Sequence, residues 1–239
     1  MKKSAWRAAI ALSLIGVAGA AEASSVRITE YMYQGGHAGV SGANEWGEFV
    51  EFTNIGTTAV DMTSWSFDDD SRTAGSVNFG SIFGVVAPGQ SVILTDLTAA
   101  RFRSIWSLDS SVKVYGNNGA NLGRADELNL YNSSGTLEDR LTFGDQSGLG
   151  PRTQRVSANP NSLAALGANT ANTWILSSIG DAEGSRRSSF AAAELAELGN
   201  PGTSRFAPVP LPAAAWLMLS GLGAVGAFSR RRAAKAAAA

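Results

Sequence analysis

Candidate metal ligands are densest in a run of three carboxylates: Asp68, Asp69 and Asp70. Three more acidic side chains come shortly before this run: Glu45, Glu48 and Glu51. Calcium binds about six to eight oxygen ligands, so this region could supply part of a site. The loop pattern D-x-[DN]-x-[DN]-G is absent, however, and consecutive residues of a strand point to opposite faces. We therefore expect no metal ion or other cofactor. The alternative is a calcium-binding module that uses the acidic cluster at 68–70.

His37 is the only histidine, and it lies between glycines in residues 35–39. A histidine in a loop can act as a general base, but the G-x-S-x-G pattern of a serine nucleophile is absent. One histidine and no cysteine exclude the usual zinc sites, which need three or four such ligands. We expect no catalytic residues. The alternative is a secreted hydrolase of phosphoesters or glycans, in which His37, Glu48, Asp68 and Asp70 would share one pocket.

The composition favours many short strands over long helices. Charged residues make up 16% of the chain, against about 25% in ordinary globular proteins, and there are 27 glycines. The net charge is −1 and no basic block occurs, so we expect no nucleic-acid partner. The absence of cysteine fits an exported bacterial protein as well as a cytosolic one.

Alternating apolar and polar residues predict half-buried strands in four segments: 26–31, 48–53, 91–95 and 112–114. A hairpin is predicted from 127–131 to 136–143, with Leu137, Leu141 and Phe143 on one face and a turn at Asn132-Ser133-Ser134-Gly135. Ala87-Pro88-Gly89-Gln90 predicts another tight turn. About seven to nine strands at this spacing indicate an all-β, antiparallel sandwich. We also expect short helices at 162–166, capped by Asn161 and ended by Gly167, and at 191–198.

The most informative stretch is GEFVEFTNIGTTAVDMTSWSFDDD, residues 47–70. Trp65 is large enough to fill the centre of a sandwich, Asn54 and Gly56 can shape a chain reversal, and Asp61 can accept backbone hydrogen bonds at a turn. None of these roles requires catalysis. These residues form a series spaced E-x-x-E-x-x-N-x-G…V-D-M-x-x-W: Glu48, Glu51, Asn54, Gly56, Asp61 and Trp65.

This series resembles that of the lamin tail domain, an immunoglobulin-like β-sandwich. The resemblance continues in APGQSVILTD (87–96), in ELNLYNSSGTLEDRLTFGD (127–145) and in the closing Gly199-Asn200-Pro201-Gly202. It covers most of residues 26–205 and implies that residues 24–206 form one such domain.

The N-terminus has the three parts of a secretory signal peptide: basic residues up to Arg7, an apolar core over 8–20, and small residues. Ala21-Glu22-Ala23 matches the A-x-A cleavage pattern, with 18–20 as an alternative. We predict that residues 1–23 are a signal peptide cut by signal peptidase between Ala23 and Ser24.

The C-terminus contains an uncharged segment of 18 residues, Leu211–Phe228, followed by Arg230, Arg231 and Arg232. About 17 to 25 apolar residues span a bilayer, and an arginine cluster stays on the cytoplasmic side. These features predict a transmembrane helix over about 211–228, which places residues 24–208 outside the cytoplasmic membrane.

The five residues before this helix strongly resemble the VPLPA variant of the PEP-CTERM sorting signal: Val209, Pro210, Leu211, Pro212 and Ala213. Two prolines keep such a segment extended, as a processing enzyme requires. The resemblance implies that an exosortase recognises residues 207–239, so contact with the cytoplasmic membrane would be transient. It also implies a Gram-negative, exopolysaccharide-producing source. We expect a structural, adhesion or exopolysaccharide-associated component of the cell envelope, outer surface or extracellular matrix, with exopolysaccharide or other envelope proteins as partners.

Overall fold

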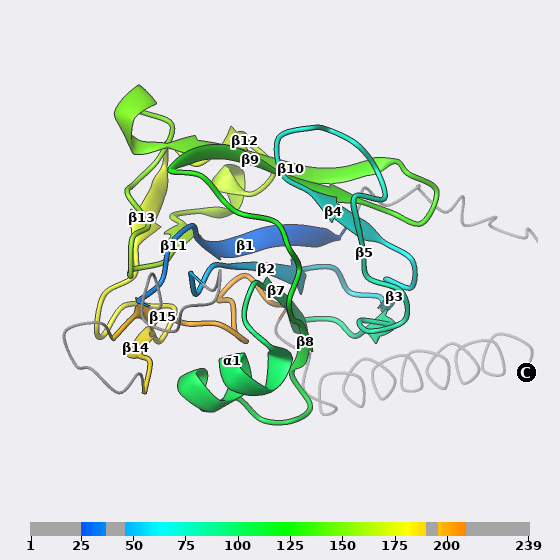
Figure 1. The fold of residues 1–239 in the computed structure, drawn as a ribbon, viewed down its shortest axis with the longest axis horizontal. Helices are drawn as coiled ribbons and strands as arrows, with labels where there is room; N and C mark the ends of the chain where they lie inside the picture. Colours follow the sequence, from blue (N-terminus) through cyan, green and yellow to red (C-terminus); the bar gives the residue numbers. More distant parts are fainter. Residues whose placement is uncertain (1–24, 37–45, 190–195, 209–239) are drawn as a thin grey trace, which may run out of the picture.

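Two β-sheets packed face to face form the body of the protein in a computed structural model, which describes residues 25–36, 46–189 and 196–208 (Figure 1). The six-stranded sheet has the order β13 (Trp174–Leu176), β11 (Ala158–Pro160), β1 (Val26–Met32), β2 (Phe49–Asn54), β7 (Ser91–Thr95) and β8 (Lys113–Tyr115). The five-stranded sheet has the order β12 (Asn169–Thr170), β10 (Leu137–Gly144), β9 (Ala125–Tyr131), β4 (Ser66–Asp68) and β5 (Val77–Asn78). The predicted β-sandwich is therefore confirmed.

Two short strand pairs lie beside the main sheets. One joins β3 (Val60–Asp61) to β6 (Val85–Val86), and the other joins β14 (Arg186–Arg187) to β15 (Leu198–Gly199). The predicted seven to nine strands were too few, because two-residue strands leave almost no alternating pattern in a sequence. An antiparallel sandwich was also only partly right, since β8 pairs with β7, and β12 with β10, in parallel.

Aromatic and aliphatic side chains between the two sheets form the main hydrophobic core. Phe52 of β2 lies 6.4 Å from Phe67 of β4 between ring centroids, so this contact joins one sheet to the other. Trp65 belongs to the same cluster, as its predicted central role requires. Burying such side chains stabilises the fold by about 1.5–3 kcal/mol each.

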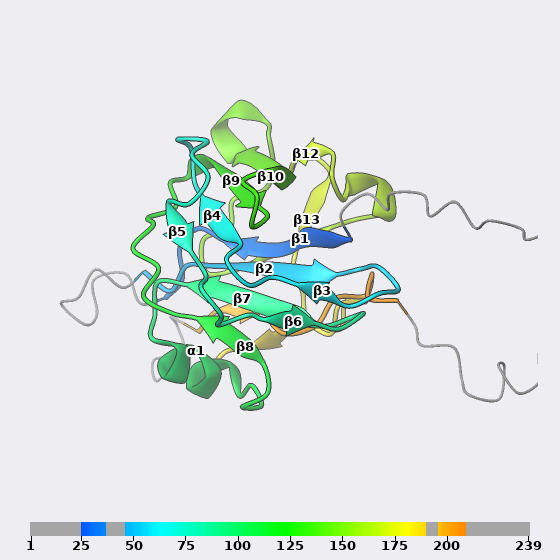
Figure 2. The same cartoon turned by 90° about the vertical axis from the view of Figure 1, so that its right-hand side faces the viewer.

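The six-stranded sheet is also covered on its other face, by helix α1 (Ala99–Trp106), as Figure 2 shows. Phe102 and Trp106 of α1 pack on Phe49 of β2 in a second hydrophobic cluster. Helix α1 covers Phe49, and the segment 199–202 contacts Glu51, so every residue of β2 is buried. Every residue of β7 is buried as well, and the predictions of half-buried strands at 48–53 and 91–95 were therefore wrong. A period-2 pattern identifies a strand, but it cannot indicate that a later segment covers the polar face.

Helix α1 was not predicted from the sequence. Thr98 caps its N-terminus by accepting a hydrogen bond from the Arg101 N–H at 3.2 Å, and Phe102 and Trp106 lie one turn apart on its buried face. The helix predicted at 162–166 is only a 3-10 turn, η2 (Leu163–Ala165), and Asn161 is not its cap, because Ser162 precedes it. Of the helix predicted at 191–198, residues 191–195 lie outside the described residues, and Leu198 belongs to β15.

The predicted hairpin is confirmed as β9 and β10, with Gly135 at a φ of 76° in the turn. One detail was wrong: Leu137 does not share the buried face of Leu141 and Phe143, and its side chain is 39% exposed. An irregularity in the register between Leu137 and Asp139 turns it outward. A second 3-10 turn, η1 (Asp145–Ser147), follows β10.

Several predicted features fall outside the described residues. They are the signal peptide with Ala23 and Ser24, the loop residues His37 and Glu45, and the whole of 209–239 with its sorting motif, apolar segment and arginine cluster. Within the ranges that the structure describes, no helix has both the length and the apolar character needed to cross a membrane.

Candidate functional site

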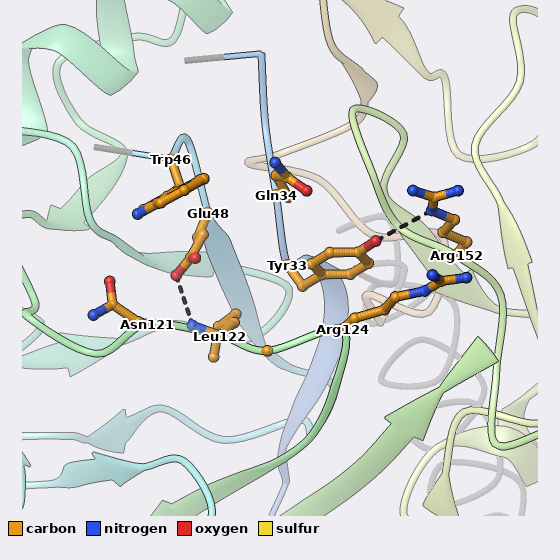
Figure 3. Close-up of a pocket in the computed structure, with 9 residues that line it drawn as sticks. Tyr33, Gln34, Trp46, Glu48, Asn121, Leu122, Arg124 and Arg152 are labelled. Atoms are coloured by element: carbon orange, nitrogen blue, oxygen red, sulfur yellow. Dashed lines mark hydrogen bonds between the residues drawn. The ribbon is translucent and has the colours of Figure 1, made fainter. Parts of the chain in front are cut away.

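A pocket of about 590 Å³ opens where the chain enters and leaves the central strands of the six-stranded sheet (Figure 3). Its lining comes from the end of β1, the approach to β2, the segment before β9 and the loop after β10: Tyr33, Gln34, Trp46, Glu48, Asn121, Leu122, Gly123, Arg124 and Arg152. Its volume lies within the range of about 300–1,000 Å³ typical of small-molecule sites.

Glu48 is the buried carboxyl group of the pocket. Its Oε2 accepts a 2.8 Å hydrogen bond from the Leu122 N–H, and the Thr95 hydroxyl donates to its backbone oxygen at 2.7 Å. Burial, helped by the nearby carboxylates of Asp96 and Asp126, raises the pKa of Glu48 to about 9. The carboxyl group is therefore protonated at neutral pH, and it can donate a hydrogen bond.

Two arginines lie near each other on the other side of the pocket (Figure 3). Arg124 forms a bidentate pair with Asp145, with Nε–Oδ1 and Nη2–Oδ2 distances of 2.7 and 2.5 Å. Arg152 donates from Nε to the Tyr33 hydroxyl at 3.4 Å, and the Tyr33 ring stacks on Phe143 of β10. The pKa of Asp145 is lowered, first by its hydrogen bond from Arg124 and also by the charge of Arg152. Two cations thus face one carboxylate, which leaves this side of the pocket positively charged.

Trp46 forms part of the pocket rim, and its side chain is 40% exposed. Its backbone is held firmly: the Trp46 and Gly47 N–H groups both donate to Oδ2 of Asp96, and the Gly35 N–H donates to the Trp46 oxygen at 2.7 Å. The indole ring is therefore presented to solvent by a fixed backbone, an arrangement suited to contact with a flat ligand face.

The predicted acidic cluster does not belong to this pocket. Asp68 accepts hydrogen bonds from the Ser71 hydroxyl at 2.7 Å and the Thr73 N–H at 3.2 Å, which close the turn after β4, while Asp69 and Asp70 are more exposed. Of the described acidic residues in the alternative hydrolase site, only Glu48 lines the pocket. Across the described ranges, no three His, Cys, Asp or Glu side chains are grouped so that they could hold a metal ion.

Asn54 and Asp61 of the motif form local hydrogen bonds to backbone groups. The Asn54 side chain donates to the Thr58 and Val86 oxygens at 2.8 and 3.0 Å, and its oxygen accepts from the Gly56 N–H at 3.0 Å. Asp61 accepts from the Thr63 N–H at 2.9 Å. These contacts shape the reversal between β2 and β4.

Glu51 has a role that the sequence did not indicate. It lies opposite Glu30 of β1, and the two carboxylates accept backbone N–H groups from the segment 199–202. Glu30 was not singled out from the sequence, and neither were Tyr33 or Trp46 of the pocket. Arg124 and Arg152 belong to a scattered set of arginines that could contact a polyanionic polysaccharide, but ordinary surface solubility explained that set more simply. Trp46 could have been considered as a candidate site residue, because it directly precedes the informative stretch 47–70. No sequence pattern, however, connects it with the residues near 124 and 152.

A family model described as Lamin Tail Domain matches residues 19–145, a range that includes the motif, the pocket approach at 46–48 and the β9–β10 hairpin. No curated protein sequence matches the chain.

Proposed function

The chain belongs to the lamin tail domain family, and we propose that it is an exported, non-catalytic surface protein whose immunoglobulin-like sandwich associates with exopolysaccharide.

The observation that carries the structural part of this proposal is how the motif residues are used. Asn54, Asp61 and Glu51 direct their polar atoms to backbone groups of the fold, and Trp65 is buried in the core. Groups engaged in this way hold a scaffold together, and fewer of their atoms remain to act on a substrate. Function would then depend on what the scaffold binds.

The export and sorting part is supported by the sequence at both ends. Lys2, Lys3 and Arg7 precede an apolar stretch and an A-x-A site, and the motif 209–213 precedes an apolar segment ending in Arg230–Arg232. We propose that signal peptidase removes 1–23, that the tail holds the precursor in the cytoplasmic membrane, and that an exosortase-type enzyme then cuts near the motif.

Intact mass and cell fractionation of the native protein test the sorting step. We expect a mature species that starts near Ser24, lacks the residues after about 213 and fractionates with the exopolysaccharide layer. Replacing residues 209–213 by alanines should leave the precursor in the cytoplasmic membrane. Inner-membrane protein that still carries Arg230–Arg232 in wild-type cells would overturn the proposed sorting.

Purified protein tests the proposed absence of catalysis. We expect no hydrolysis of phosphoester or glycosidic substrates above a buffer control. Turnover that disappears in Glu48→Gln would instead establish the hydrolase alternative, since Glu48 is the buried acid of the pocket.

A further inference from the structure

We infer that the pocket bounded by Trp46, Glu48, Arg124 and Arg152 binds an acidic sugar unit, with the sugar ring on the Trp46 indole and its carboxylate on Arg152. This inference rests on the proposed association with exopolysaccharide, and it adds the binding site and the class of sugar.

The charge balance of the pocket favours an anion. Arg124 is already paired with Asp145, whereas the hydrogen bond of Arg152 within the described residues uses only Nε, toward the neutral Tyr33 hydroxyl. Its terminal Nη1 and Nη2 atoms are the planar donor pair that binds a carboxylate with two parallel hydrogen bonds. The Arg152 side chain is exposed, so a ligand can reach it.

Two other carboxylates lie near the pocket, and backbone N–H groups hold both of them. The Asp96 carboxylate accepts the N–H groups of Trp46 and Gly47, and Asp126 accepts those of Gly123 and Glu127. Neither residue lines the pocket. Both oppose ionisation of Glu48, which therefore presents a neutral carboxyl group to a ligand.

The remaining lining residues fit a sugar better than a simple anion. Trp46 and the Asn121 side chain lie on one side of the pocket, across from Arg152 (Figure 3). A pyranose ring has an apolar C–H face that can pack on an indole, while its hydroxyls need amide or carboxyl partners such as Asn121, Gln34 and Glu48. A phosphate ion would use the arginine alone. A nucleic-acid strand would need a basic groove, which a chain of net charge −1 with scattered arginines does not provide.

Isothermal titration calorimetry on the full chain in detergent tests the site with two matched ligands. One is a uronic-acid tetrasaccharide, and the other is the neutral tetrasaccharide of the same linkage, with a C6 alcohol in place of the carboxylate. We expect the acidic ligand to bind at least about tenfold more tightly, because it gains a charge-assisted bidentate contact.

Three variants locate the binding. Arg152→Gln should remove the preference for the acidic ligand, whereas Trp46→Ala should weaken both ligands by about tenfold, since stacking does not depend on charge. Arg187→Gln is the matched control, because Arg187 is an exposed arginine of β14 that does not line the pocket, and its affinities should equal those of the wild type. Unchanged melting temperatures would show that the variants fold.

The outcomes separate this inference from the proposed function. If wild-type protein fractionates with exopolysaccharide but Trp46→Ala and Arg152→Gln bind the acidic tetrasaccharide as tightly as wild type, the pocket assignment is wrong and the association stands. Equal affinity for the two tetrasaccharides, or equally tight binding of a mononucleotide or an acidic peptide, also overturns the assignment. Loss of both calorimetric binding and cofractionation in the wild type overturns the proposed association itself.

Discussion

Glu30 of β1 and Glu51 of β2 are directly opposed in the antiparallel register, and together they anchor a segment about 150 residues or more away in the sequence. Glu30 Oε1 accepts the Asn200 N–H at 2.8 Å, and Glu51 Oε2 accepts the Gly202 N–H at 2.6 Å. Both side chains are fully buried. This carboxylate pair therefore joins the last described segment to the central strands of the six-stranded sheet.

The carboxylate pair makes stability depend on pH. Burial first, and then the neighbouring Glu51 carboxylate, raises the pKa of Glu30, although Ser157, Asn200 and Arg186 oppose the rise. Burial likewise raises the pKa of Glu51 to about 7 from 4.5. The folded state thus holds a proton that the unfolded state has released. The contribution of these two groups to stability is therefore greatest below about pH 4.5 and falls as pH rises toward 7, by up to about 1.4 kcal/mol per pH unit for each group.

Urea unfolding at several pH values between 4.5 and 8 measures this dependence, to which the raised pKa values of Glu48 and Asp139 add in the same direction. Glu51→Gln should lose less stability than wild type over this range, because its amide has no proton to release. Asp70→Asn, at an exposed site, should follow the wild-type curve. Identical pH slopes for Glu51→Gln and wild type would contradict the inference that Glu51 retains a proton in the folded state.

Asn200→Ala should lower the free energy of unfolding by about 1–3 kcal/mol, because it removes one hydrogen-bond partner of the buried Asn159 amide and the bond from Asn200 to Thr203. Asn200 Oδ1 accepts from Asn159 Nδ2 at 2.8 Å, and its own Nδ2 donates to the Thr203 oxygen. Chemical unfolding at pH 6 provides the measurement. Asn172→Ala is the control at an exposed asparagine and should cost less than about 0.5 kcal/mol. Equal losses in the two variants would refute a special role for the closing segment.

Gly56→Ala should destabilise the protein by about 1–3 kcal/mol through crowding. An added Cβ would lie 2.3 Å from the Ser25 Cβ and 2.8 Å from its Oγ. Ser25→Gly removes both atoms, so the double variant should recover much of the loss. Thermal unfolding of the two single variants and the double variant gives the coupling between the sites, and purely additive effects would show that this contact is not the cause.

Calcium and chelators should leave the melting temperature unchanged. The polar atoms of Asp68 are engaged with Ser71 and Thr73, and the described residues contain no group of acidic side chains that could hold a metal ion. Differential scanning calorimetry with millimolar calcium and then with a chelator tests this expectation. If calcium raised the melting temperature by several degrees and Asp68→Asn abolished this rise, the protein would instead bind calcium at the acidic cluster.

Local sequence patterns predicted most of the sandwich because its main signals span only a few residues. The β9–β10 hairpin carries turn formers between two alternating runs, and Asn54 acts on groups within a few positions of itself as well as on Val86. Helix α1 was missed because it is only eight residues long, and packing of Phe102 and Trp106 on Phe49 stabilises it more than any local pattern.

The candidate site could not be predicted in the same way, because no local pattern joins its parts. Glu48 was identified as a motif residue, but Trp46, Leu122 and Arg152 come from three separate segments that meet in the folded structure. The alternative hydrolase site, which would have placed Asp68 and Asp70 in one pocket with Glu48, was wrong for the same reason. The two residues are close in sequence, but they lie at the turn after β4 and do not line the pocket.

By itself the sequence determined the strands, the turns and the β-sandwich class, since alternation and turn chemistry are local properties of the chain. Only the tertiary structure decided that both faces of β2 are buried, that Glu30 and Glu51 hold the closing segment, and that an aromatic side chain and two arginines share a pocket. The physical reason is that burial and the charge of a site depend on which distant segments pack together, and spacing along the chain does not encode that packing.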